Sequence, residues 1–464
     1  MTLKPTALSV ALMMAFAAAP ALAQSNDDLL KELRALKSKV EELEKKLQAV
    51  PAPPAEGQAQ WGMTQEQSKD FNRLLVKTEA LEDAQESQGF KSLKIAGYMD
   101  PSFIYNKNQN RAGFQFLSPV NDDGYNYDNS YFGTVSLDFQ KELEGGTKWR
   151  LTLMPSRGAG LVANPTGGSI VHEASVSVPL DDLSTRVIAG QIPDWSGYEY
   201  IQATTTKLVT RGLLLDFTEP TAYTAAGMEF IRGKFDTKVV VGNFNTPMRS
   251  AKQTQPVIAY RVDYSKGEFD GWGLAGVEGK VWNPNTGETS RLDLFEFDTY
   301  FIRGDLTLQG QAGFGRQRQA STVPDANGNL RDAQWFGLSG LAAYKLEPRL
   351  EAVARLDYLR NDKNGGGLLG YSGFTDADGN AFGTDGRNGI GVSPTCFASE
   401  AAATCKGANR TALAVGMNYL LTSNTTLKAE YRLDTATQAV FYDARSGAYK
   451  KQNQLLGASM VVSF

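Results

Sequence analysis

Apolar and polar positions alternate with a period of two along much of the chain after residue 90. The closing segment, 453–464, shows this most clearly, because one parity is apolar and the other is mostly small or polar, with Leu455 and Val461 as exceptions. Successive side chains of a β-strand point to opposite faces, so the pattern predicts a strand with one apolar face. The apolar parity consists of Leu456, Ala458, Met460, Val462 and Phe464. Clean alternation also marks 133–140, 148–153 and 427–434.

The number and length of these segments favour a transmembrane barrel over a soluble sandwich. Both folds alternate, but a sandwich does not usually supply so many strands of about ten residues, the length that crosses a bilayer at a tilt. Long and short connections also alternate, as they do when loops are extracellular and turns are periplasmic. The long ones include 107–129, 156–168, 318–332, 362–408 and 436–452, and the short ones are 143–146, 180–183, 234–236, 267–270, 303–304, 346–348 and 422–424.

Strand counts made from the two ends of this region meet between residues 191 and 223. If 207–217 were a spanning strand, the strand directions would clash by one. If 193–222 is instead a single long connection, the parity is restored. We therefore predict that residues 91–464 form an all-β transmembrane β-barrel of about 16 antiparallel strands, with 18 strands as the alternative.

The N-terminus, residues 1–23, has the pattern of a secretory signal peptide. Lys4 provides the basic start, an apolar run begins at Ala7, and Ala21-Leu22-Ala23 fits the cleavage pattern. A transmembrane anchor is the less favoured interpretation, because the apolar run is short and ends at small residues. No later stretch reaches the length of a transmembrane helix, so we expect an exported chain whose membrane span is made of strands.

A heptad repeat follows the signal peptide and predicts a periplasmic coiled coil over 24–50. Two pairs at the facing flank positions, Glu32 with Lys37 and Lys39 with Glu44, have opposite charges, which suits a parallel homo-oligomer. A single amphipathic helix packed on another element is the alternative. The apolar heptad positions are Leu29, Leu33, Leu36, Val40, Leu43, Leu47 and Val50.

Two further segments separate the coiled coil from the barrel. Residues 51–63 form a Pro-rich linker, since proline removes backbone donors and ends a helix. Residues 64–90 are predicted to hold a second helix, because Thr64 and Gln67 have capping-box spacing. Continuation of the coiled coil and docking at the barrel mouth both remain open for this helix.

Composition agrees with a barrel. A mean hydropathy of -0.32 with 46 Gly, 18 Tyr and 23 Phe is too polar for a helical membrane protein but rich in aromatics, as expected when half of each strand faces lipid and half faces water. The formal net charge of -4 argues against a nucleic-acid partner. The two cysteines, Cys396 and Cys405, have eight residues between them, and in an oxidising compartment we predict that they form a disulfide.

The whole layout resembles DcaP-type trimeric porins of Gram-negative bacteria. The resemblance rests on the signal peptide, the coiled coil, the linker, a barrel opening with Lys94-Ile95-Ala96-Gly97-Tyr98, and closure on Phe464. It implies a homotrimer, a terminal Phe464 that is part of the signal read by the barrel insertion machinery, and passive uptake of small polar solutes, anionic ones included. A looser resemblance to OmpL-like β-barrel porins rests on Gly190-Gln191, Gly197-Tyr198-Glu199 and the stretch 211–227.

In sixteen-stranded porins the third extracellular loop narrows the lumen, so the resemblance implies this role for 193–222. Charges of both signs together with aromatic rings there would orient polar solutes. Lys207 and Arg211 are the strongest candidates for electropositive constriction residues. The other candidates are Asp194, Trp195, Tyr198, Glu199, Tyr200, Asp216 and Glu219.

On the predicted wall, an Arg-x-Asp spacing occurs three times with apolar residues in between. Both members of each pair share one face of a strand, and charge on the lipid face would cost about 2–4 kcal/mol, so we expect these pairs to point inward. We interpret them as cross-strand charge pairs lining a water-filled wall rather than as a dedicated binding ladder. The pairs are Arg261/Asp263, Arg355/Asp357 and Arg432/Asp434, and Lys148, Arg150 and Lys428 are predicted to point inward with them.

Neither catalysis nor metal binding has support. The single histidine, His172, alternates with Ala174, Val176 and Val178 in a way that places it towards lipid or an interface, where it could not serve a nucleophile. The strings 325–329 and 376–380 are similar to the start of a calcium loop but lack the downstream Glu. We therefore predict no enzyme, no cofactor and no metal site.

The sequence is consistent with two functions. The first is an outer-membrane porin for small hydrophilic, possibly anionic solutes, embedded in a lipid and lipopolysaccharide bilayer, with a lumen narrowed by 193–222. The second is a structural barrel whose coiled coil anchors periplasmic partners or peptidoglycan.

Overall fold

The computed structural model describes residues 65–87, 92–117, 133–154, 170–244, 255–283, 285–369, 374–375, 381–382, 384–385, 388–399 and 402–464. The predicted signal peptide (1–23), coiled coil (24–50) and linker (51–63) lie outside the described residues. The chain divides into two units, 1–88 and 89–464. None of the helices in the described part is both long and apolar enough to cross a membrane.

The described part of the first unit is the helix α3 (Gln65–Ser87), which falls within the range predicted for the second helix. Its apolar side chains Phe71, Leu74 and Leu75 are exposed.

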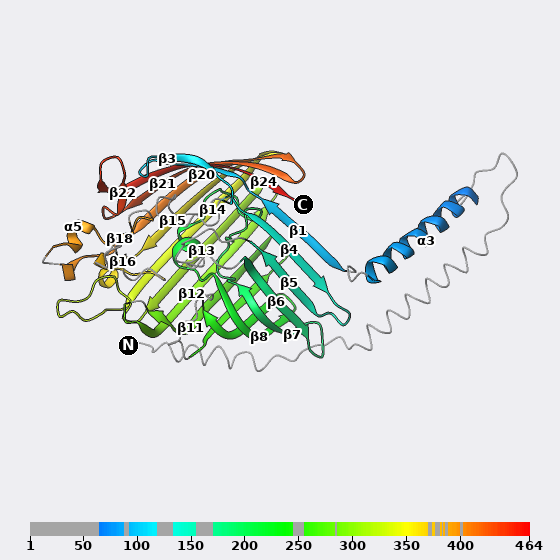
Figure 1. Cartoon of the computed structure of the whole chain (residues 1–464), viewed down its shortest axis with the longest axis horizontal. Helices are drawn as coiled ribbons and strands as arrows, with labels where there is room; N and C mark the ends of the chain where they lie inside the picture. Colours follow the sequence, from blue (N-terminus) through cyan, green and yellow to red (C-terminus); the bar gives the residue numbers. More distant parts are fainter. Residues whose placement is uncertain are drawn as a thin grey trace. The chain divides into compact units, whose positions relative to one another are not determined.

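The second unit is a closed antiparallel β-barrel (Figure 1). Eighteen strand segments form one sheet. The first barrel strand is β1 (Leu93–Met99) continued by β2 (Ser102–Asn106), and the second is β3 (Arg111–Gln115) continued by β4 (Val135–Glu142), so the barrel has sixteen strands. The other strands are β5 (Lys148–Leu153), β6 (Val171–Pro179), β7 (Thr185–Pro193), β8 (Ala222–Arg232), β9 (Phe235–Phe244), β10 (Val257–Ser265), β11 (Asp270–Asn283), β12 (Glu288–Arg303), β13 (Leu306–Gln317), β14 (Ala333–Glu347), β15 (Leu350–Arg360), β20 (Arg410–Thr422), β21 (Thr425–Ala436) and β24 (Gln452–Ser463).

The barrel closes where β24 pairs with both β1 and β2. The terminal residue takes part, because the Phe464 backbone N–H donates to Gly97 O at 3.0 Å and the Gly97 N–H donates back to Phe464 O at 3.2 Å. The predicted number of sixteen strands is therefore confirmed, and the alternative of eighteen is wrong. Short elements lie in the loops, namely α4 (Leu213–Phe217), η2 (Lys363–Gly365), β16 (Phe374–Thr375), β17 (Ala381–Phe382), β18 (Thr384–Asp385), β19 (Ile390–Gly391), α5 (Pro394–Phe397), η3 (Ala402–Thr404), β22 (Phe441–Asp443) and β23 (Ala448–Lys450).

The predicted connection 107–129 differs from the structure. The chain turns back within 107–110, pairs β3 with β2, and leaves the sheet only after Leu117. The Leu117 N–H donates to Gly133 O at 2.6 Å, and this hydrogen bond joins the segment after β3 to the segment before β4. Gly133 has φ +57°, and a Cβ there would lie 2.0 Å from Gln115 O, so only glycine fits. β3 has only five residues, which is too short for an alternating pattern to identify it as a strand.

Alternating burial gives the barrel an apolar outside. In β14, Phe336 and Leu338 are exposed, whereas Trp335, before them, and Leu341, after them, are buried. The same holds for β24, in which the predicted apolar parity is mostly exposed. An exposed apolar belt around a closed sheet is the surface that a bilayer requires.

Candidate channel and its inner loop

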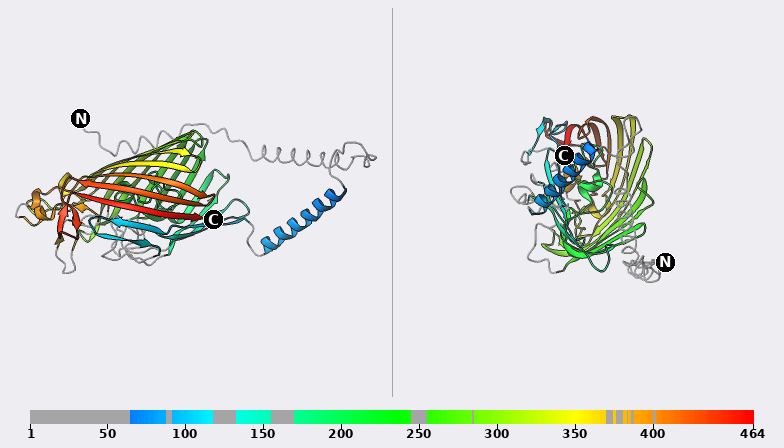
Figure 2. Two further views of the ribbon diagram at one scale, coloured as in Figure 1. Left: turned by 90° about the horizontal axis from the view of Figure 1, so that it is seen from above. Right: turned by 90° about the vertical axis from the view of Figure 1, so that its right-hand side faces the viewer.

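Residues 194–221, which we call the inner loop, connect β7 to β8 as one segment, close to the predicted 193–222. The loop lies inside the ring of strands (Figure 2) and contains α4. Its residues are buried to a degree unusual for a loop, with Thr210, Leu213 and Phe217 fully inaccessible. A buried loop must find partners for its backbone polar groups. Here the inward side chains of the barrel wall supply them.

Arg355 on β15 is the central anchor of the inner loop. Its Nη1 donates to Glu199 Oε1 at 2.7 Å and to Thr210 O at 2.9 Å, and its Nη2 donates to Arg211 O at 2.8 Å. Its Nε pairs with Asp357 Oδ2 at 3.0 Å. One guanidinium thus joins two parts of the loop to the wall.

Two further wall arginines act in the same way. Arg432 Nη1 donates to Arg211 O at 2.6 Å while its Nε pairs with Asp434 at 2.9 Å. Arg261 Nη1 donates to Trp195 O at 2.6 Å. The three Arg-x-Asp pairs do point inward, but the prediction that they line a water-filled wall is wrong for Arg355 and Arg432, which are 1% and 0% exposed. The inner loop covers them.

The wall strands β15 and β21 hold the loop at three other points. Glu430 accepts the Thr210 N–H at 2.7 Å and the Thr210 hydroxyl at 2.5 Å. Lys428 points inward as predicted, and its Nζ donates to the backbone oxygens of Ala203 and Thr206 at 2.7 and 2.5 Å. The third contact is an ion pair of 2.6 Å between Lys207 and Glu351.

Apolar contacts complete the attachment. Val209, Leu213 and Phe217 belong to one buried cluster with wall residues such as Ile104 and Leu455. Leu455 is one of the two apolar residues that break the alternation of the closing strand. It points inward and belongs to this buried apolar cluster, which explains why an apolar residue is tolerated there.

The two strongest candidates for an electropositive constriction do not present free charge. Arg211 is 2% exposed and donates to Val209 O at 2.7 Å and to Ile201 O, so its guanidinium serves the loop itself and the prediction for it is wrong. Lys207 is tied to its ion-pair partner and borders a separate cavity of about 350 Å³ near the short turns. Three other candidates lie as follows: Tyr198 bonds Ser339 through its hydroxyl at 2.6 Å, Glu199 pairs with Arg355, and Lys148 lies 3.8 Å from Glu142.

A larger cavity of about 750 Å³ lies between the inner loop and the wall formed by β1 and β4–β9. Its lining extends from Pro193, at the long-loop end of β7, to Phe464, at the short-turn end of the barrel. The carboxylates in the lining are Asp138, Glu173, Asp194, Glu199, Glu219 and Glu229, and the basic side chains are Arg150, His172 and Lys238.

Arg150 points into this cavity, as predicted, and bridges two carboxylates. Its Nε donates to Asp138 Oδ1 at 2.8 Å, and its Nη1 lies 3.3 Å from Glu173 Oε2. Thr152 also donates to Asp138, at 2.7 Å. The group of two acids and one base is therefore held rigidly on neighbouring strands.

The prediction that His172 faces lipid or an interface is wrong. The pairing of β5 with β6 passes from Thr152↔Glu173 to Leu153↔Val171, so His172 is the extra residue of a β-bulge. Its ring lines the cavity, with Nε2 3.4 Å from the Gln202 Nε2 of the inner loop. A bulge shifts the parity by one, and no residue pattern in β6 announces it.

Asp194 begins the inner loop at the rim of the cavity. It accepts hydrogen bonds from the Tyr223 hydroxyl and from the Ser196 N–H, the latter at 2.9 Å. Burial raises the pKa of Asp194 to about 6, against the lowering effect of these donors.

At the other end of the loop, Glu219 faces the wall residue Glu296. The Gln311 side-chain amide donates to both carboxylates, at 2.6 Å each. Burial, and next the carboxylate of Glu296, raise the pKa of Glu219 well above its usual range. Glu296 and Gln311 were not among the predicted site residues, although Glu296 alternates with Phe295 and Phe297 in a way that indicates an inward side chain.

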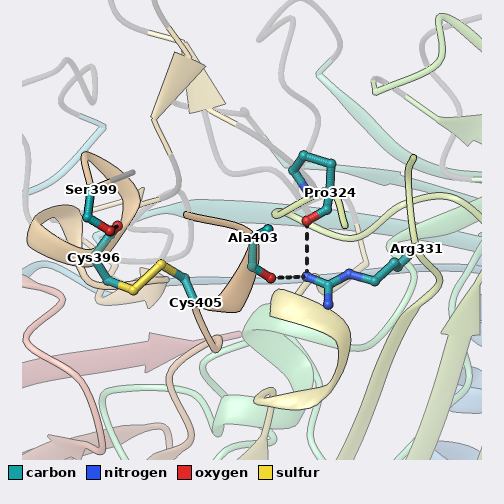
Figure 3. Close-up of a disulfide and its surroundings, with 6 residues drawn as sticks. All are labelled: Pro324, Arg331, Cys396, Ser399, Ala403 and Cys405. Carbon is teal, nitrogen blue, oxygen red and sulfur yellow. Dashed lines mark hydrogen bonds between the residues drawn. A yellow bond between two sulfur atoms is a disulfide. The ribbon is translucent and has the colours of Figure 1, made fainter. Parts of the chain in front are cut away.

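The disulfide lies in the long loop between β15 and β20. Cys396 and Cys405 are joined with an S–S distance of 2.03 Å (Figure 3). Nearby, Arg331 Nη2 donates to Pro324 O and to Ala403 O at 3.3 Å each, which links the loop before β14 to the loop before β20.

One of the two calcium-like strings is described. Asp325 Oδ1 accepts the N–H groups of Asn327 and Asn329 at 2.9 and 2.8 Å, so its carboxylate closes a turn. The other string, 376–380, lies outside the described residues. Within the described ranges, no group of three or more metal-ligating side chains has the arrangement to hold a metal ion.

A protein-family model identifies the family of this chain. The model described as "Protein of unknown function (DUF3138)" matches residues 1–255 and 274–464. The chain belongs to this family. A comparison with curated proteins gives no match.

The chain is also similar to solved structures of outer-membrane proteins. The anion-selective porin from Comamonas acidovorans is 11% identical with a TM-score of 0.49, and the match covers 80% of this chain and 99% of that chain. A loop L8 deletion mutant of OmpT, an outer membrane protein of Vibrio cholerae, is 10% identical with a TM-score of 0.47 over 80% of this chain and 99% of that chain. Salmonella typhi OmpF in complex with daunomycin is 10% identical with a TM-score of 0.47 over 80% of this chain and 97% of that chain.

Proposed function

We propose that this DUF3138 protein is an outer-membrane porin that lets small hydrophilic solutes diffuse passively through the barrel, with the inner loop narrowing the passage. The observation that carries the proposal is the cavity of about 750 Å³ beside the inner loop, whose lining includes six carboxylates and the basic side chains of Arg150, His172 and Lys238. A polar passage inside a barrel with an apolar exterior meets the two requirements of a membrane diffusion channel.

The location follows from the same surface. Exposed side chains such as Leu338, Leu356 and Val415 are suited to lipid, and the N-terminal pattern predicts export. We propose that the short turns face the periplasm, together with the coiled coil of 24–50, and that the barrels assemble as a homotrimer. Phe464, whose backbone closes the barrel against Gly97, is the residue that we propose the insertion machinery reads.

We do not extend the proposal to anionic solutes. Carboxylates outnumber basic side chains in the cavity lining, and Arg211, which would have favoured anions, is buried in the loop. The preference implied by the resemblance to DcaP-type porins therefore lacks a physical basis in this lumen.

Single-channel recording of the purified, full-length protein in a planar bilayer tests the function. We expect stable open steps, grouped in threes if the barrels form trimers, and swelling of proteoliposomes in small neutral sugars. A barrel that inserts but does not conduct would overturn the proposal and favour the structural alternative, in which the coiled coil anchors periplasmic partners or peptidoglycan.

A separate variant tests whether the inner loop narrows the passage. The double variant Arg355→Gln/Arg432→Gln removes two loop anchors, so we expect a higher or noisier conductance than that of the wild type. Arg360→Gln is the matched control, because Arg360 lies on the same strand as Arg355 but is exposed and pairs with Asp362. An unchanged conductance in the folded double variant would contradict the role.

A further inference from the structure

We infer that the passage beside the inner loop selects small cationic solutes over anionic ones, and that the acidic group of Asp138 and Glu173 on the wall contributes most to this choice. The inference rests on the proposed channel function, which it makes more specific.

The first argument is the excess of acidic groups. The cavity lining contains six carboxylates and two side chains, Arg150 and Lys238, that carry a permanent positive charge. One of the six, Glu199, is neutralised by Arg355 from behind the loop. Glu219 is not counted, because its pKa is raised well above the usual range, and Glu229 is balanced by Lys238 and Arg186. The remaining three carboxylates against Arg150 leave the lining negative. In a narrow passage with walls of low dielectric constant, such an excess concentrates cations and repels anions.

The second argument is that both basic residues are already neutralised. Arg150 lies between Asp138 and Glu173, at 2.8 and 3.3 Å, so two negative charges share one positive charge. Lys238 lies between Asp236 and Glu229, at 2.8 and 3.3 Å. An anion that approaches either base therefore meets two carboxylates beside it.

The third argument is that four other wall arginines are out of reach. Arg261, Arg355, Arg410 and Arg432 have side chains that are at most 8% exposed. Each forms an ion pair with an aspartate, and three of them also donate to the inner loop. The charge of these four side chains is used in buried contacts and does not line the passage.

Asp194 adds a carboxylate that no base neutralises. Among the described residues it forms no ion pair, and its partners are the hydroxyl and N–H donors of Tyr223 and Ser196. It lies at the point where the inner loop leaves the wall, so a solute passing the loop meets it.

The test is the reversal potential of the full-length protein in a planar bilayer with a potassium chloride gradient at neutral pH. We expect potassium to be favoured over chloride by a factor on the order of ten. In the double variant Asp138→Asn/Glu173→Gln, which leaves Arg150 without acidic partners, the ratio should fall to about one or below. The single variant Asp194→Asn keeps the wall group intact and should lower the ratio less. Asp325→Asn, the same change of charge in an extracellular turn, should leave it unchanged.

The outcomes separate the two proposals. A protein that does not conduct at all overturns the channel function. A conducting protein with a ratio at or below one overturns only the cation preference. A cation-selective wild type whose ratio is the same in the folded double variant overturns the assignment to Asp138 and Glu173. Flux of lysine exceeding that of glutamate into proteoliposomes would extend the preference to organic solutes, and the reverse order would contradict it.

Discussion

Arg355 and Glu199 form a buried ion pair, with Nη1 and Oε1 2.7 Å apart, between the wall and the inner loop. Their side chains are 0% and 6% exposed. The pair joins a strand to a segment more than a hundred positions earlier in the chain. Since an isolated buried charge is costly, each member depends on the other for its place in the barrel.

The first prediction concerns this pair. Arg355→Gln leaves Glu199 without its charged partner and removes donors to two backbone oxygens, so we expect a loss of about 3–5 kcal/mol in the free energy of unfolding. Urea unfolding in lipid vesicles, followed by tryptophan fluorescence, measures it. The control Arg360→Gln breaks an exposed pair and should cost much less than Arg355→Gln, because exposed ion pairs contribute little to stability. Equal losses in the two variants would contradict the anchoring role.

The second prediction concerns pH. The pKa of Asp194 is about 6 in the folded protein and 3.8 as its ordinary value. The folded state therefore keeps its proton at a pH where the unfolded state has lost it, so stability is greatest below about pH 4 and declines as the pH rises to about 6. The decline is at most about 3 kcal/mol, and less because the side chain is partly exposed.

Comparison with Asp194→Asn isolates this effect, because the amide does not titrate. The difference in unfolding free energy between wild type and variant should change most between about pH 4 and 6. Titrating groups that do not interact with Asp194 cancel in the difference. Glu219 adds a smaller change at higher pH, because the Asp194 carboxylate contributes to raising its pKa. A constant difference across the range would show that Asp194 titrates normally.

The third prediction concerns the disulfide. The disulfide closes a loop of ten residues, from Cys396 to Cys405. Removing it with Cys396→Ser/Cys405→Ser should cost about 2–3 kcal/mol of local stability, since the loop between β15 and β20 gains conformational freedom. Limited trypsin digestion should then cut next to Lys406, while the strands stay resistant. Dithiothreitol should have the same effect on the wild type but none on the variant. Identical digestion rates with and without the bridge would argue against a structural role.

The fourth prediction concerns Gly133. In Gly133→Ala the new Cβ would approach Gln115 O to 2.0 Å at a backbone with φ +57°, so the junction between β3 and β4 must shift. We expect a loss of stability of about 1–3 kcal/mol. The shift in gel mobility between folded and heated barrels measures it. Gly145→Ala is the control, since it also has positive φ but open space around it. A loss no larger than that of the control would show that the contact is not limiting.

Much of the barrel follows from the sequence alone, because the side chains of a strand alternate strictly between two faces. That local rule predicts the outward Leu456 and Met460, the inward Arg261, Arg355 and Arg432, and the short turns of the barrel. Combined with the alternation of long and short connections, it also predicts that 193–222, observed as the inner loop 194–221, is a connection and that about sixteen strands close the sheet.

The role of the inward residues could not be predicted in this way, because it depends on which distant segment covers each of them. The inner loop packs against one side of the wall. There Arg355 forms a buried ion pair with the loop, and Leu455 belongs to a buried apolar cluster. The guanidinium of Arg211 donates to the backbone of the loop itself. On the uncovered side, a single bulge turned His172 into the cavity. Alternation reports the face of a side chain; the packing of segments far apart in the chain determines whether that face meets water, the loop or a charge.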